Sequence, residues 1–216
     1  MLRGMTLHRQ TLAVAALLAA ALACWIVAVR GMEMMGGLVP FLGVWVTTMV
    51  AMMLPSAAPM VAAYAGLGRE RPSTPLFVLG YLAVWTTYGL AAYFLAMELP
   101  DWSWLPGAGL VLAGVYQLTP VKDSCLRRCR APLGFVMQRW RGGPFGAFSM
   151  GVEHGAWCAG CCTGLMVALF ALGMTSVVWM AGVALLILGE KALPGGERLA
   201  PVTGLALVAA AVVVLA

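Results

Sequence analysis

Long apolar stretches separated by short polar segments dominate this chain. Several stretches approach or exceed about 20 residues, the length at which an α-helix crosses a bilayer. Most charged residues lie in the polar segments between them. The pattern therefore predicts an all-α fold, a polytopic transmembrane helical bundle of about seven spans. The expected spans are residues 11–29, 38–67, 76–97, 104–118, 145–172, 176–188 and 199–215.

The composition agrees with this class of protein. Hydrophobic residues make up 62% of the 216 residues and charged residues only 10%, whereas a soluble domain is about half apolar and a quarter charged. We find no internal repeat and no soluble domain, so residues 1–216 are expected to form a single integral membrane domain with a basic cytoplasmic loop at 120–143. The lipid bilayer is then the expected surrounding partner.

Lysine and arginine residues indicate the orientation, because cytoplasmic segments carry an excess of them. With a cytoplasmic N-terminus, twelve of the 13 fall in inside segments, Arg69 and Arg71 among them. Only Arg30 falls outside. The same distribution explains the net charge of +5 as a topology signal. Nucleic-acid binding is therefore not expected.

The first span also has features of a cleaved signal peptide. It has a basic start, an apolar run and the small-residue sequence "ALA" at residues 21–23. However, the apolar run continues to Arg30, which is longer than a typical signal core. A membrane anchor is therefore the preferred interpretation.

The fifth expected span carries side chains that suit a soft metal ion. On a helical wheel of about 100° per residue, Cys158 lies about 40° and Cys161 about −20° from His154, with Cys162 at the edge of the same stripe. Imidazole and thiolate groups favour Cu(I) or Zn(II). The segment therefore predicts a metal site, although buried cysteine often serves only as a small apolar residue.

Glycines and one glutamate complete this span. Gly151 with Gly155, and Gly160 with Gly164, form small-xxx-small steps that let a neighbouring helix approach closely. Glu153 points away from the cysteine stripe. It is expected either to pair with a loop arginine or to serve as a proton or cation site.

The second expected span contains thioethers and two prolines. Met49, Met52 and Met53 share one side of the helix, and Pro55 and Pro59 predict a broken helix near a site. At about 1.5 Å per residue, these thioethers and the cysteines of the fifth span both reach the middle of the bilayer. Methionine favours Cu(I) over Zn(II). The thioethers and the His–Cys stripe are therefore expected to form one central site, unless the methionines merely pack the core.

The basic loop holds a further pair of cysteines. Cys125 and Cys129 are four residues apart, so one helical turn would place their thiols side by side. Arg127, Arg128 and Arg130 are expected to lower the pKa of a nearby thiol. This pair is expected to serve the cytoplasmic end, and the alternative is a loop that only fixes topology.

Four segments carry a family resemblance, in the order "TTMVAMMLPSAAPM", "YQLTPVKDSCLRRCRAPLGF", "HGAWCAGCC" and "LGEKALPGG". Together they resemble a bacterial domain-of-unknown-function family of predicted metal-binding integral membrane proteins, some of which are labelled copper chaperones. The resemblance covers residues 34–196 and implies a multi-pass protein of the bacterial inner (plasma) membrane. It implies no established reaction. The metal ligands that it implies are Cys125, Cys129, His154, Cys158, Cys161 and Cys162.

These observations predict a protein that handles Cu(I), as a chaperone or in a transport-like role, with Zn(II) as the alternative ion. A protein that donates or accepts the metal is the expected partner. No ATP-coupling motif occurs, and an enzyme is less expected than a metal-binding protein.

The main alternative function is a membrane thiol–disulfide oxidoreductase. In that case Cys158-Ala-Gly-Cys161 would act as a redox pair, and Cys125 with Cys129 would relay electrons. A haem protein is disfavoured because no C-x-x-C-H sequence occurs. A structural subunit of a larger complex is a further alternative.

Overall fold

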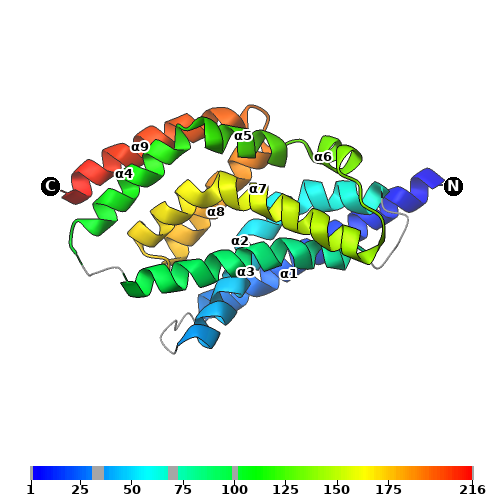
Figure 1. Cartoon of the computed structure of the whole chain (residues 1–216), viewed down its shortest axis with the longest axis horizontal. Coiled ribbons are helices and arrows are strands. Elements are labelled where there is room, and N and C mark those ends of the chain that lie inside the picture. Colours follow the sequence, from blue (N-terminus) through cyan, green and yellow to red (C-terminus); the bar gives the residue numbers. More distant parts are fainter. Residues whose placement is uncertain (1, 31–36, 68–72, 99–101, 216) are drawn as a thin grey trace. The chain divides into compact units, whose positions relative to one another are not determined.

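The computed structural model describes residues 2–30, 37–67, 73–98 and 102–215 (Figure 1). Within these ranges the chain forms nine α-helices and one short 3-10 helix, and no strand. Arg69 and Arg71 of an expected cytoplasmic segment lie outside the described residues. The helices are α1 (Leu2–Arg30), α2 (Leu38–Leu67), α3 (Ser73–Glu98), α4 (Leu105–Gln117), α5 (Pro120–Cys129), α6 (Pro132–Gln138), α7 (Gly143–Leu172), α8 (Val177–Ala192), η1 (Gly196–Arg198) and α9 (Leu199–Leu215).

Five helical segments in the described residues are long and apolar enough to cross a membrane. They are His8–Arg30 of α1, α2, α3, α7, and Gly196–Leu215, which includes α9. The fourth and sixth expected spans are present as α4 and α8, with 13 and 16 residues. Both are shorter than the length of about 20 residues that spans a bilayer. The all-α fold is therefore confirmed, and the structure gives five spanning candidates where the sequence predicts seven.

The expected break in α2 is wrong. The helix continues through Pro55 and Pro59. Proline at position 55 cannot donate to the carbonyl of Ala51, four residues earlier. That carbonyl instead accepts a hydrogen bond of 3.0 Å from Nε1 of Trp25 in α1. A side chain from a neighbouring helix therefore replaces the backbone donor that Pro55 lacks.

The segment 120–143, expected to be a loop, contains α5 and α6. Thr119 precedes α5, and its hydroxyl accepts a bond from the backbone N–H of Lys122. Both helices begin with a proline, Pro120 and Pro132, a residue that the first helical turn accommodates because its N–H would be unpaired there. The basic segment therefore has a defined helical structure.

The chain divides into two compact units. The first comprises residues 1–93 and 131–157, and the second comprises residues 94–130 and 158–216, so α7 contributes to both. The single integral domain stays a prediction.

In the first unit, α2 and α3 are joined by Trp45, whose Nε1 donates to the Trp85 carbonyl at 2.7 Å. Helices α3 and α7 approach closely through glycine. A Cβ on Gly151 would lie 2.0 Å from the Phe77 carbonyl oxygen, and one on Gly155 would lie 3.1 Å from that of Tyr81. The predicted role of this glycine pair is confirmed.

In the second unit, α4 and α9 lie side by side (Figure 1). A Cβ on Gly114 would lie 2.6 Å from the Gly204 carbonyl oxygen, so the glycine permits this contact. The second predicted glycine pair also faces neighbours. A Cβ on Gly160 would lie 2.8 Å from the Cys125 sulfur, and one on Gly164 would lie 3.0 Å from the Tyr116 ring. These contacts bring α4 and α5 against the second half of α7.

Candidate functional site

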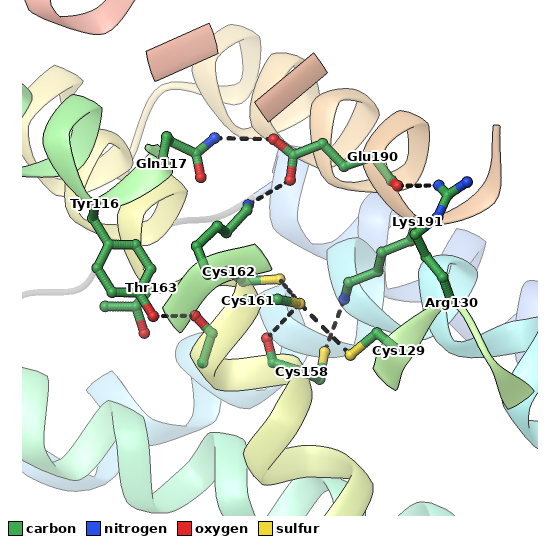
Figure 2. A network of polar contacts seen from close by, with 12 residues as sticks. Tyr116, Gln117, Cys129, Arg130, Cys158, Cys161, Cys162, Thr163, Glu190 and Lys191 are labelled. Carbon is green, nitrogen blue, oxygen red and sulfur yellow. Dashed lines mark hydrogen bonds and ion pairs between the residues drawn. The ribbon is translucent and has the colours of Figure 1, made fainter. Parts of the chain in front are cut away.

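A cluster of four cysteines, which we call the thiol cluster, lies in the second unit (Figure 2). Helix α7 supplies Cys158, Cys161 and Cys162, and the last residue of α5 supplies Cys129. The Cys161 sulfur lies 3.7 Å from the sulfur of Cys129 and 3.7 Å from that of Cys162. It also donates to the backbone carbonyl of Cys158 at 3.2 Å. Two helices therefore bring their thiols together.

The site includes a positive charge. Nζ of Lys191, near the end of α8, lies 2.9 Å from the Cys158 sulfur, as Figure 2 shows. The ammonium group donates a hydrogen bond to this sulfur. Three helices thus contribute side chains to one small region.

The sulfur spacing is compatible with metal binding. Two sulfurs bound to one tetrahedral metal at about 2.3 Å lie about 3.8 Å apart, which is close to the 3.7 Å observed for both Cys161 pairs. A disulfide requires about 2.05 Å, and all six cysteines are free thiols. Among the described residues, no group of three or more His, Cys, Asp or Glu side chains is placed to hold a metal ion. The cluster therefore offers pairs of sulfurs rather than a closed metal cage.

Cys125 does not behave as the sequence predicted. It is buried against Gly160 of α7, one turn before Cys129. Burial raises the pKa of the Cys125 thiol, and the positive charges of Arg128 and Lys122 oppose this effect without overcoming it. The expectation that the basic residues would give this thiol a lowered pKa is therefore wrong, because the cost of charging a buried sulfur is larger.

A buried ion pair lies in the same unit. Nζ of Lys122 in α5 lies 2.5 Å from Oε2 of Glu190 in α8, and the two side chains are only 1% and 2% exposed. The Gln117 side chain donates to the other carboxylate oxygen of Glu190 at 2.9 Å. Sequence reasoning treated Lys122 only as a topology signal and gave Glu190 no role. The available signal was the adjacent pair Glu190 and Lys191 at the end of an apolar run, since an ionisable residue that becomes buried needs a partner.

Arg130 connects α5 to the end of α8. Its guanidinium donates to the carbonyls of Glu190 and Leu193, the latter at 2.9 Å, and pairs with Glu197 at 2.9 Å. The Glu190 carbonyl belongs to the last turn of α8, where helix carbonyls lack intrahelical partners, and Leu193 is the residue that follows the helix. The contact ties the C-terminal end of α5, which carries Cys129, to the helix that carries Lys191.

His154 lies in the first unit, among aromatic rings. It is 3% exposed, and its ring centroid lies 6.1 Å from that of Phe77, 5.6 Å from Tyr81 and 5.9 Å from Phe135. The thiol cluster lies in the second unit. A joint ligand set of His154 and the cysteines stays a prediction.

The predicted methionines also lie in the first unit. Met49, Met52 and Met53 are at most 1% exposed, so their thioethers lie inside the protein. Their participation in a site with the thiols stays a prediction.

Glu153 forms ion pairs rather than a free acidic site. Its two carboxylate oxygens lie 3.4 Å from the Arg139 guanidinium and 3.1 Å from that of Arg141. The prediction that Glu153 pairs with a loop arginine is confirmed. The pairs fix the connection between α6 and α7.

Comparison with curated proteins and with solved structures gave no match. One family model, PpoB2, described as copper chaperone, matches residues 42–214. This range contains all four cysteines of the thiol cluster, Lys191 and the buried ion pair. Because the match covers most of the chain, the protein belongs to the PpoB2 family of copper chaperones.

Proposed function

We propose that this protein is a multi-pass membrane copper chaperone that receives and releases Cu(I) at the thiol cluster. The observation that carries this proposal is the 3.7 Å separation between the sulfurs of Cys129 and Cys161, which come from α5 and α7. Family membership supports copper as the metal. Thiolates are soft ligands that select Cu(I) over hard cations.

Pairs of sulfurs suit a metal that must be passed on. Structural metal sites are usually closed four-coordinate cages, and the described residues form no group of three or more donors placed to hold an ion. Cu(I) is stable with two thiolates, so Cys161 with Cys129 would suffice for capture. The remaining thiols would then take over one ligand at a time, and the ion would move by exchange.

Lys191 would compensate the charge of the bound ion. Cu(I) with two thiolates carries a net negative charge of one, which is costly to hold away from water. The ammonium group 2.9 Å from Cys158 cancels that charge. With a divalent ion such as Zn(II), the same two thiolates and ammonium would leave a net positive charge, so this arrangement favours the monovalent ion.

The membrane part of the proposal is a seven-span topology with a cytoplasmic N-terminus, in the bacterial inner membrane. Five long apolar helices support membrane insertion, and α4 and α8 would cross as shorter helices. The cysteines of α5 would then lie near the cytoplasmic side, where a soluble donor or acceptor protein can reach them. The Met49, Met52 and Met53 thioethers and His154 would provide further soft ligands along the path.

Competition for Cu(I) against a colorimetric chelator tests the proposal. The purified protein in detergent, kept reduced, is expected to remove Cu(I) from the chelator. Cys161→Ser and Cys129→Ser are each expected to weaken this binding at least tenfold. Cys24→Ser is the matched control, because Cys24 is a free cysteine of α1 in the other unit. Equal binding by wild type and both cluster variants would contradict the proposal.

The same preparations distinguish the thiol–disulfide alternative. If the protein binds no copper but forms a reversible Cys129–Cys161 disulfide under mild oxidation, an electron relay becomes the better account. Peptide mapping with differential alkylation detects that bond. Copper binding that requires both cysteines supports the chaperone.

A further inference from the structure

A separate apolar groove lies in the first unit between α1, α2 and α3. Its cavity volume is about 870 Å³. Nearly all of its described lining residues are aliphatic, and none of them is acidic. The lining includes Leu12, Leu17, Leu54, Val61, Val78 and Leu79.

The groove has a length that matches one leaflet of a bilayer. On α1 its lining extends from His8 to Ala20, and twelve residues at 1.5 Å each correspond to about 18 Å. One leaflet contributes about half of a hydrocarbon core that is about 30 Å thick. Ala13 and Ala16 keep the α1 side of the groove open because their side chains are short. An extended acyl chain therefore fits its length.

Among the described lining residues, the one formal charge, that of Arg9, lies at one end of the groove. His8 and Arg9 line the groove at the level of Thr74 and Pro75, which begin α3. The proposed topology places this end at the cytoplasmic surface, where anionic lipids are concentrated and basic pockets between helices bind their head groups. A phosphate there would meet Arg9 while its acyl chain entered the apolar part.

We propose that this groove binds one anionic phospholipid, with its phosphate at Arg9 and His8 and one acyl chain along Ala13 and Ala16. The proposal rests on the membrane location proposed above and is independent of the copper chemistry. A bound lipid would fill the space between α1 and the α2–α3 pair. It would thereby hold the first helix in place.

Lipid retention measured by native mass spectrometry tests this proposal. The full chain is reconstituted in vesicles of equal parts phosphatidylglycerol and phosphatidylethanolamine, extracted in mild detergent and weighed. Wild type is expected to retain one phosphatidylglycerol in several-fold preference to phosphatidylethanolamine. Arg9→Gln is expected to remove that preference, and Ala16→Leu is expected to reduce retention of both lipids several-fold.

The matched control is Ala19→Leu, since Ala19 is an exposed α1 residue outside the groove lining. It is expected to retain lipid as wild type does. If Ala16→Leu does not fold, Ala13→Leu serves as a second variant in which a larger side chain fills the groove. Copper binding is expected to be unchanged in all of these variants, so failure here is distinct from failure of the copper proposal. Equal retention of the two lipids by wild type, or unaltered retention by Arg9→Gln and both filled variants, would overturn the inference.

Discussion

Removing the charge of Glu190 is expected to destabilise the protein strongly. The carboxylate is 2% exposed, lies 2.5 Å from the Lys122 ammonium and accepts a second bond from Gln117. Glu190→Gln keeps the shape of the side chain but leaves the ammonium, 1% exposed, without its counter-charge. Breaking a buried pair in this way costs about 3–5 kcal/mol. Lys122→Met leaves the Glu190 carboxylate buried without its counter-charge, and we expect it to lower the free energy of unfolding by a similar amount.

The double variant distinguishes a buried charge effect from simple loss of packing. Lys122→Met combined with Glu190→Gln removes both charges, and replacing a whole buried pair is often nearly neutral. The two single changes should therefore sum to at least about 2 kcal/mol more than the double change. Reversible unfolding in mixed micelles, followed by circular dichroism, measures these free energies.

The exposed Asp123–Arg127 pair provides the matched control on α5, since its side chains are 49% and 64% exposed. Asp123→Asn should leave unfolding unchanged within error, because exposed pairs contribute little. The reasoning is refuted if Glu190→Gln is as mild as Asp123→Asn, or if the two single changes add up to the double change.

Three further changes test other parts of the structure. Lys191→Met should weaken Cu(I) binding about 10- to 100-fold in the chelator competition. Opposite charges about 4 Å apart attract by about 4 kcal/mol at an effective dielectric of 20, and solvent screening reduces this value. Lys191→Arg keeps the charge and should retain most of the affinity. Gly151→Ala should destabilise the fold by about 1–3 kcal/mol through overpacking against Phe77, whereas Gly182→Ala, which has open space, should not. The alkylation rate of Cys125, read from its tryptic peptide, should reach half its maximum at a pH above about 8.5, the ordinary pKa of a thiol, because burial raises the pKa of Cys125. A half-maximum at or below that pH would contradict the burial argument.

Hydropathy predicted the positions of the helices closely. The second expected span and α2 share both ends, and the seventh coincides with α9. This success has a simple cause, since long apolar runs in lipid must satisfy their backbone groups within a helix. The number of spans is harder to predict, because α4 and α8 are too short for length alone to show whether they cross.

Contacts between helices could not be read from the sequence. The wheel placed Cys158 and Cys161 on one stripe of the fifth expected span but assigned Cys129 to a separate cytoplasmic pair. In the structure Cys129 contacts Cys161, because the basic segment folds into α5 and packs along Gly160 of α7. Likewise, the hydrogen bond that Pro55 cannot donate to the Ala51 carbonyl comes from Trp25, which lies 26 residues earlier in the chain. Such partners depend on tertiary packing, which a single-helix periodicity does not encode.

The most direct test is X-ray absorption at the copper edge on protein loaded with one Cu(I) per chain. The thiol cluster predicts a first shell of sulfur only, with two or three sulfurs, that is lost or reduced in number in Cys129→Ser and unchanged in Cys24→Ser. A first shell of nitrogen or oxygen, or a sulfur shell that Cys129→Ser leaves intact, would contradict a copper site shared by α5 and α7.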